Sequence, residues 1–191
     1  MKENKTYQKI VQAADDLFYR HGFEHTSFAD IAQAVQISRG NFYYHFKTKD
    51  EILEAVITKR LSDREDMLNV WAQQGETPQE RINSFISILL VNSEKIKKYG
   101  CPIGTLTSEL AKMNHQAIEN ANGLFTLFRV WLKQQLMLMG HDRNADIYAL
   151  HILARSQGVA TLANAFCDDE FINREVALLQ EWVAALPKVK S

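Results

Sequence analysis

The chain has 191 residues, of which 46% are apolar and 24% are charged, so it is long enough to bury a substantial core. Only 8 glycines and 3 prolines are present, which argues against a loop-rich β protein and favours helices. The formal net charge is −1, so any binding to nucleic acid has to come from a local concentration of basic side chains.

The sequence contains no apolar run long enough for a membrane span, and its polar start lacks the apolar centre of a signal peptide. The two cysteines do not make a disulfide framework and suit a reducing compartment. We therefore expect a cytoplasmic protein that has no contact with a membrane.

Apolar residues recur at helical spacing along most of the chain, and no segment shows the alternation typical of a strand. A first amphipathic helix is expected over residues 6–21. Ser27, Ser38 and Thr48 are suitable N-caps for the next three helices. Further helices are expected over residues 78–97, 106–113, 115–139, 144–167 and 169–186. The predicted fold class is all-α.

The segment from Thr26 to Lys49 predicts two short helices joined by a tight turn. The second of these, after Ser38, is only about two turns long. Phe42 and Phe46 lie four residues apart, so one face of this helix is expected to rest on the core. The remaining faces are rich in exposed polar and aromatic side chains. This pattern favours a polar, anionic partner, and duplex DNA is the leading candidate.

The side chains of this short helix suit specific parts of a DNA duplex. Arg39 can form two hydrogen bonds to guanine, and Asn41 can do the same with adenine. Tyrosine, histidine and lysine side chains suit phosphate oxygens, and Gly40 leaves room for close approach. Ordinary surface positions are the alternative for these side chains. The residues expected to contact DNA are Thr26, Ser27, Ser38, Arg39, Gly40, Asn41, Tyr43, Tyr44, His45 and Lys49.

The first quarter of the chain resembles a known family on several short motifs. They are A-x-x-L-F at 14–18, H-G-F at 21–23 and, most specific, S-R-G-x-F-Y-Y-H-F at 38–46. Together they resemble the TetR-type bacterial transcriptional regulators. Gln36 is a departure, because family members usually have glycine at this turn. A non-glycine residue in a left-handed turn costs about 1 kcal/mol, so some strain is expected there.

The resemblance implies a two-part, all-α architecture. A helix-turn-helix DNA-binding domain of three helices is expected over residues 1–47. A long helix would join it to a helical bundle over residues 48–191, which binds an effector and forms a homodimer. The implied function is a repressor that a small molecule releases from a palindromic DNA operator. In such a dimer the two recognition helices lie about one turn of DNA apart.

The last two helices are the expected pairing surface, because the resembled family forms a four-helix bundle there. Small residues in the segment 151–166 would permit close helix approach. The alternative is that these helices only close the core of the monomer. The expected interface residues are Leu153, Gly158, Leu162, Val176, Leu179, Trp182 and Val183.

The effector site is expected among the middle helices, where the resembled family commonly binds small molecules. Its candidate residues are mostly apolar, and residues of this kind are more often part of an ordinary core. They are Phe85, Leu89, Cys101, Phe125, Phe128, Trp131 and Phe166.

Cys101 offers a second way of sensing. It precedes a predicted helix and follows Lys95, Lys97 and Lys98, a setting that can stabilise a thiolate. The surrounding phrase G-C-P-I-G-T-L also resembles a branch of the family, including NemR, whose members sense reactive electrophiles or oxidants. The alternative is an unreactive cysteine in a turn.

A helical enzyme or ligand carrier without a DNA role remains as a different class of function. His21 and His25 are four residues apart, but Gly22 interrupts the helix and no third ligand is evident, so no metal site is expected. Motifs for metalloproteases, nucleophile elbows and phosphate loops do not occur. We expect no enzymatic activity, no catalytic residues and no cofactor.

Overall fold

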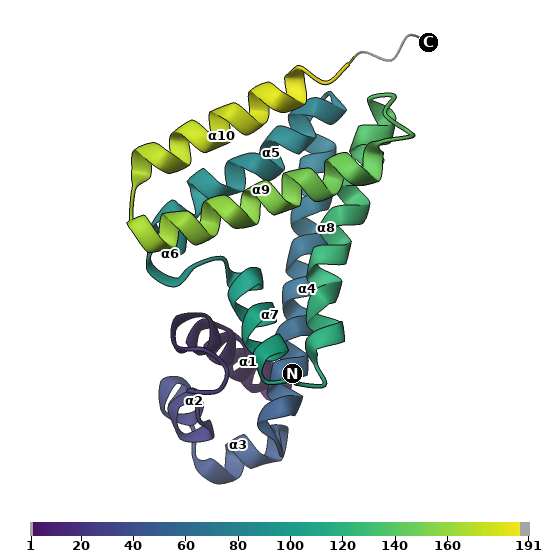
Figure 1. Cartoon of the computed structure of the whole chain (residues 1–191). Coiled ribbons are helices and arrows are strands. Elements are labelled where there is room, and N and C mark those ends of the chain that lie inside the picture. The colour runs from purple at the N-terminus through teal and green to yellow at the C-terminus, as the bar shows by residue number, and fades with distance from the viewer. Residues whose placement is uncertain (1, 188–191) are drawn as a thin grey trace. The chain divides into compact units, whose positions relative to one another are not determined.

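The computed structural model describes residues 2–187, with side chains from Lys5 onward (Figure 1). Within this range the chain forms α-helices and contains no strand, which confirms the predicted all-α class. None of the described helices combines the length and the apolar character needed to span a membrane. The helices are α1 (Lys2–His21), α2 (Phe28–Val35), α3 (Arg39–His45), α4 (Lys49–Gln74), α5 (Pro78–Val91), α6 (Ser93–Tyr99), α7 (Pro102–Lys112), α8 (Ile118–Leu138), α9 (Ala145–Phe166) and α10 (Asp169–Ala184).

One predicted helix proves to be two. The apolar spacing over residues 78–97 predicted a continuous helix, but the structure breaks it at Asn92 between α5 and α6. The Asn92 side chain donates a hydrogen bond to the carbonyl of Ile88, 3.1 Å away, and its backbone N–H donates to the same oxygen. Asparagine competes with the helix for backbone groups in this way. Ile96 continues the apolar spacing beyond the break and is buried, which is why periodicity alone missed it.

The first compact unit combines residues of 1–63 with residues 102–124. Its core joins Ile10 of α1, Phe42 of α3, Ile52 of α4 and Leu110 of α7, each at most 1% exposed. The early half of α4 and Leu106 and Leu110 of α7 therefore pack in the same core as the helix-turn-helix. The functional boundary after residue 47 stays a prediction.

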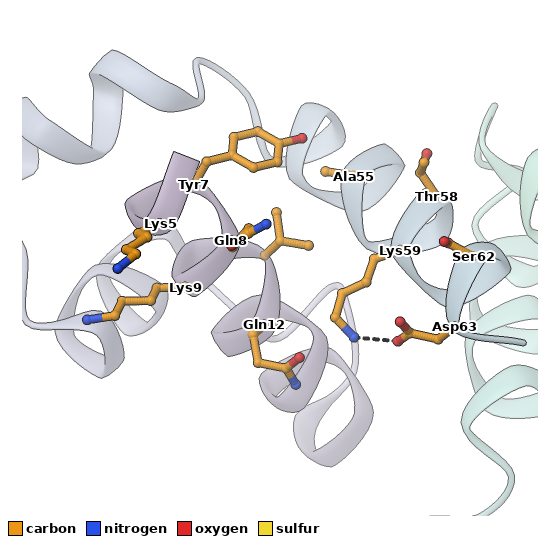
Figure 2. A pocket seen from close by; sticks show the side chains of 11 residues that line it. Lys5, Tyr7, Gln8, Lys9, Gln12, Ala55, Thr58, Lys59, Ser62 and Asp63 are labelled. Atoms are coloured by element: carbon orange, nitrogen blue, oxygen red, sulfur yellow. Dashed lines mark hydrogen bonds and ion pairs between the residues drawn. The ribbon is translucent and has the colours of Figure 1, made fainter. Parts of the chain in front are cut away.

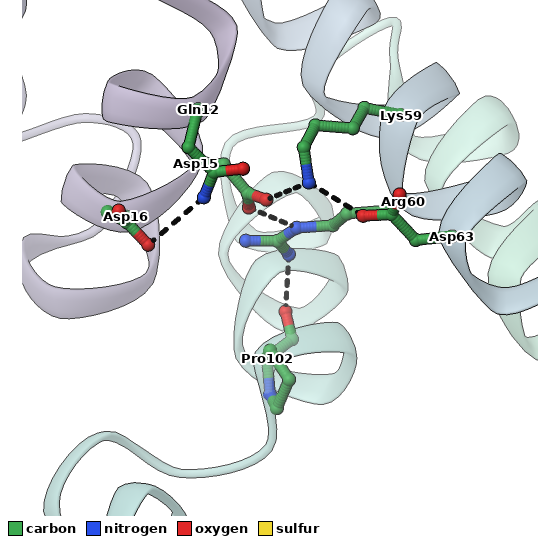
Figure 3. Close-up of polar contacts among 7 residues, drawn as sticks. All are labelled: Gln12, Asp15, Asp16, Lys59, Arg60, Asp63 and Pro102. Atoms are coloured by element: carbon green, nitrogen blue, oxygen red, sulfur yellow. Dashed lines mark hydrogen bonds and ion pairs between the residues drawn. The ribbon is translucent and has the colours of Figure 1, made fainter. Parts of the chain in front are cut away.

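A buried ion pair links three elements of this unit (Figure 3). The guanidinium of Arg60 on α4 is only 3% exposed, and its Nε donates to Asp15 of α1 at 2.7 Å. Its Nη1 donates to the carbonyl of Pro102, the first residue of α7, at 2.6 Å. Lys59 forms a second, longer ion pair with Asp15 at 3.5 Å. Each charged group of the buried pair thus has a partner, as burial of a charge requires.

The second compact unit comprises residues 64–101 and the described residues after 124. Within it, α10 packs against both α5 and α9, and α6 packs against α9 (Figure 1). The apolar face of α10 is turned into this unit, because Ile172, Val176, Leu179 and Val183 are at most 2% exposed.

Candidate nucleic-acid interface

The short helix α3 is fixed by its cap and by two phenylalanines. Ser38 is the N-cap, and its hydroxyl accepts a hydrogen bond from the backbone N–H of Asn41 at 3.3 Å. Phe42 is 1% exposed and meets the ring of Phe28 edge to face at 5.2 Å. Phe46 is 3% exposed, and the ring of Tyr7 stacks on it at 4.9 Å. A helix of seven residues is marginal alone, so these contacts stabilise it.

The helix before it, α2, begins with a complete capping box. The hydroxyl of Ser27 accepts from the N–H of Asp30, and the Asp30 carboxylate accepts from the N–H of Ser27. The hydrogen bonds from the side chain and backbone of Ser27 lower the pKa of Asp30 below its ordinary value of 3.8. At neutral pH the carboxylate is therefore ionised and can complete this cap.

The turn between α2 and α3 has the left-handed residue that the sequence suggested. Gln36 has φ 57° and ψ 44°, and its N–H reaches the carbonyls of Ala32 and Gln33. The turn keeps the backbone shape that glycine usually provides, at the conformational cost of a side chain there.

The outward face of α3 carries the residues expected to read DNA. Arg39, Gly40 and Asn41 are exposed, as are Tyr43 at 46% and Tyr44 at 64%. A side chain at Gly40 would meet no atom within 4 Å, so this part of the surface is open. His45 is partly exposed at the end of the helix. The structure brings these side chains onto one short element, and their contacts with DNA stay a prediction.

Two of the side chains expected to contact DNA have hydrogen-bond partners within the chain. Thr26 is only 2% exposed, and its hydroxyl donates to the carbonyl of Gly22 at 2.7 Å. The ammonium group of Lys49 donates to the carbonyls of Phe23 and Glu24 at 3.0 and 3.2 Å, and it lies 4.3 Å from the centre of the Phe23 ring. Spacing alone could not reveal these partners.

Lys47 is a basic residue that the predicted contact set omitted. It is exposed, and its ammonium group donates to the carbonyl of Tyr43 at the end of α3. Its backbone N–H donates to Glu51 at 2.6 Å. The sequence could have indicated Lys47 as a candidate DNA contact, because no acidic residue occurs from Gln33 to Thr48.

Glu109 on α7 is the other residue that sequence reasoning missed. Its two carboxylate oxygens accept hydrogen bonds from the backbone N–H groups of Phe23 and Glu24, each at 2.9 Å. These partners are 85 and 86 positions away in the chain, so no local pattern predicts them.

The carboxylate of Glu109 also lies near two other side chains of types that can bind metal ions. Among the described residues, ligand atoms of Glu24, His25 and Glu109 lie within 4.8 Å of one another. The two backbone N–H groups that Glu109 binds already account for the position of its carboxylate.

A groove of about 680 Å³ lies between α1 and α4 in the first unit (Figure 2). Figure 2 shows Lys5 and Lys9 pointing away from α4, while Lys59 is paired with Asp63. The groove therefore presents mainly uncharged polar side chains and the apolar groups of Val11 and Ala55.

Most of the expected effector residues lie together in the second unit. Phe85 meets Phe128 edge to face at 5.2 Å, and Trp131 lies 6.1 Å from Trp71 between ring centres. Leu89 is buried and Phe125 is partly buried. Phe166 does not join them, because it is 69% exposed at the end of α9, and its expected place in the pocket wall is wrong for the monomer.

Cys101 precedes α7 as expected, but its surroundings are less basic than the sequence suggested. It is partly buried, and the side-chain amide of Gln157 donates to its sulfur at 3.5 Å. The ammonium of Lys97 pairs with Glu94 and Asp169, and the hydrogen bond that it donates to Asp169 is the main cause of the raised pKa of Lys97. A role of Cys101 as a reactive sensor stays a prediction.

The expected dimer residues divide into two sets. Four face the interior of the second unit and cannot pair with another chain there: Leu153, Val176, Leu179 and Val183, at 7, 2, 2 and 0% exposed. The partly buried Trp182 contacts the rings of Tyr148 and His151. Gly158 and Leu162 are exposed on α9. For the four buried residues, the structure favours the alternative that these helices close the core of the monomer.

An exposed apolar face remains on α9. Ile147 is 64% exposed, Leu150 44% and Leu162 42%, and helical spacing places them beside Ala154 and Gly158. A face with this content is typical of a surface that another protein covers.

Comparisons with known proteins agree with this geometry. A family model described as bacterial regulatory proteins of the tetR family matches residues 10–56, which contain α2 and α3. An uncharacterised HTH-type transcriptional regulator of Lactococcus lactis subsp. lactis is 28% identical over 179 residues, covering 92% of this chain and 91% of that protein.

Two further similarities span most of the chain. The HTH-type transcriptional repressor DhaR of Mycobacterium sp. (strain GP1) is 22% identical over 83% of this chain and 82% of its own. The crystal structure of a TetR-family transcriptional regulator from Cytophaga hutchinsonii has the same fold, with a TM-score of 0.85 at 18% identity, over 100% of this chain and 98% of that one. The capped helix α3, the all-α fold and these similarities agree: residues 10–56 match the tetR family of bacterial regulatory proteins, and the chain as a whole has the fold of a TetR-family transcriptional regulator.

Proposed function

We propose that the protein is a homodimeric repressor that binds a palindromic DNA operator and is released from it by a small molecule. The observation that carries this proposal is α3. Its apolar side is anchored by Phe42 and Phe46, while Arg39, Asn41 and Tyr44 are exposed on the same two turns. This division of faces is typical of a helix that enters the major groove of DNA.

Within this proposal the exposed residues have different tasks. Arg39 and Asn41 have the donors and acceptors to read base edges. Tyr43, Tyr44 and His45 suit the phosphate backbone, which fixes the register of the protein on the duplex. The N-terminal residues 1–47 would supply these contacts, while the remaining helices bind the effector and the second subunit.

The homodimer would form through the exposed face of α9, together with exposed residues of α10. Leu178 of α10 is 45% exposed and adds apolar area. Gly158 has no atom within 4 Å of the place where a side chain would begin, so a partner helix could approach closely. A two-fold pair of subunits matches the two halves of a palindromic site.

The effector would bind among the helices of the second unit. The aromatic pairs Phe85–Phe128 and Trp71–Trp131 give this region the apolar, aromatic lining that small-molecule sites prefer. Such a ligand lowers operator occupancy only as far as it binds the free form better than the DNA-bound form. The proposal includes no enzymatic step, and a repressor of this kind acts in the bacterial cytoplasm, where its DNA lies.

The test is a fluorescence anisotropy titration with DNA from the region upstream of the gene. We expect one palindromic fragment to bind far more tightly than a scrambled fragment of equal length. Affinity should fall steeply between about 50 and 200 mM salt, because phosphate contacts release counterions. Equal affinity for both fragments would refute sequence-specific recognition.

A further inference from the structure

The loop between α1 and α2 is held by side chains from two distant helices. The backbone N–H groups of Phe23 and Glu24 donate to the carboxylate of Glu109 on α7. The carbonyls of the same two residues accept hydrogen bonds from the ammonium group of Lys49 on α4. The carboxylate of Glu109 thus binds the two N–H groups, and the ammonium group of Lys49 binds the two carbonyl groups, of these consecutive residues.

The carboxylate of Glu109 binds the loop with both of its oxygens. Each oxygen accepts one N–H at 2.9 Å, and hydrogen bonds to a charged acceptor are stronger than neutral ones. Gly22, just before, has φ +87°, and a side chain there would begin 2.9 Å from the carboxylate. Glycine therefore suits this position in two ways, through its backbone angle and through the room that it leaves for the carboxylate of Glu109.

This loop determines where α2 begins. Thr26 is buried and bonds back to Gly22, and Ser27 then caps α2. Phe28, the first residue of α2, packs against Phe42 of α3. The position of the loop is therefore transmitted through one short helix to the helix proposed to read DNA.

We propose that Glu109 and Lys49 are positioning residues for DNA binding, which hold the α1–α2 loop and do not themselves contact DNA. This inference rests on the proposed function as a DNA-binding regulator. It gives α7 a task in the recognition of DNA although α7 lies far from the helix-turn-helix in the sequence.

The first test uses Glu109→Gln, which keeps the size of the side chain but places an amide –NH₂ against a backbone N–H. We expect operator affinity to fall about tenfold, the effect of weakening one charged hydrogen bond of this kind. The sign is diagnostic, because loss of a negative charge by itself should strengthen binding to DNA. The matched control is Glu119→Gln, at an exposed position at the start of α8, which removes the same charge and should not weaken binding. Unchanged or tighter binding by Glu109→Gln would overturn the role of Glu109.

A second measurement needs no DNA. Amide hydrogen exchange in Glu109→Gln should become faster at Phe23 and Glu24, while exchange in α9 and α10 stays as in the wild type. Unchanged exchange in the loop would overturn the proposal. If wild-type protein binds no palindrome but the loop exchange responds as expected, the proposed function fails and the structural part of the inference stands.

Lys49→Met separates positioning from phosphate contact. A lysine that neutralises one phosphate contributes about 0.9 to the slope of log affinity against log salt. We expect Lys49→Met to lower operator affinity without changing this slope. A slope that decreases by about 1 would show a phosphate contact and overturn the assignment for Lys49. Thermal unfolding followed by circular dichroism confirms that each variant is folded.

Discussion

Neighbouring residues of α3 have opposite surroundings, and this contrast supports its proposed role. Phe42 is 1% exposed, whereas Arg39, three positions earlier, is exposed next to the open surface at Gly40. The sequence predicted both environments, because a two-turn helix with one apolar side has only one way to face the core. It did not predict the burial of Thr26, whose hydroxyl donates to the carbonyl of Gly22.

Replacing Arg39 by alanine should weaken binding to the operator and relax specificity at one base pair. The expected loss of discrimination there is about 1–3 kcal/mol, because a bidentate contact with guanine is removed. Titrations against operators with single base changes would measure it. Arg143→Ala removes an exposed arginine from the turn after α8 and should leave the pattern unchanged. A uniform loss across all operators would indicate that Arg39 contacts phosphate instead.

Replacing Gln36 by glycine should stabilise the protein by about 0.5–1 kcal/mol. The left-handed conformation costs a non-glycine residue about 1–2 kcal/mol, and the extra freedom of glycine in the unfolded chain offsets part of this gain. Urea unfolding is the measurement. Asn114→Gly is the matched control, because asparagine also has positive φ here, at 49°, but tolerates it better. A destabilised Gln36→Gly variant would contradict the expected strain.

At the scale of elements, α7 differs most from what the sequence suggested. Its apolar spacing predicted a helix over 106–113, and the structure begins it at Pro102. The sequence could not show that Leu106 and Leu110 share a core with α1 and α3, because nothing local marks the partner of an apolar face. The contacts of Arg60 with Pro102 and of Glu109 with the α1–α2 loop are equally non-local.

The pair of Asp15 and Arg60 offers a test of this packing. Asp15→Ala should destabilise the protein by about 3 kcal/mol, because it leaves the buried guanidinium without its carboxylate. The adjacent Asp16 is exposed and bonds only to Gln12 among the contacts in Figure 3, so Asp16→Ala should cost less than about 0.5 kcal/mol. Urea unfolding of both variants measures the difference. A loss in the free energy of unfolding for Asp15→Ala as small as that expected for Asp16→Ala would show that the buried pair contributes little to stability.

For the whole molecule, the exposed apolar face of α9 is the feature that the proposed dimer explains. The sequence predicted pairing through α9 and α10, but several of the residues selected for it lie inside the monomer, since both faces of these helices carry apolar side chains. Burial in the structure separates the two faces. Leu150, Gly158 and Leu162 are exposed, while Val176 and Val183 are not.

Gly158→Arg should convert the dimer to a monomer and weaken operator binding. The monomer has room for the side chain, so its stability should not fall. Light scattering during gel filtration would measure the mass, and unfolding in urea the stability. Gln134→Arg, at an exposed position of α8, is the control and should remain dimeric. A Gly158→Arg protein that stays dimeric would place the interface elsewhere.

The sequence by itself determined most of the helices, the caps of α2 and α3 and the two faces of the short helix α3, because spacing, capping and turn residues act within a few positions of the chain. Ser27, Ser38 and Gln36 behave as their local chemistry predicts. Only the tertiary structure decided which apolar faces are buried and which polar groups meet. The carboxylate of Glu109 finds the backbone of Phe23 across 86 positions, and Lys49 turns toward the same loop. Such pairs depend on packing between distant helices, and packing is not encoded in any single stretch of sequence.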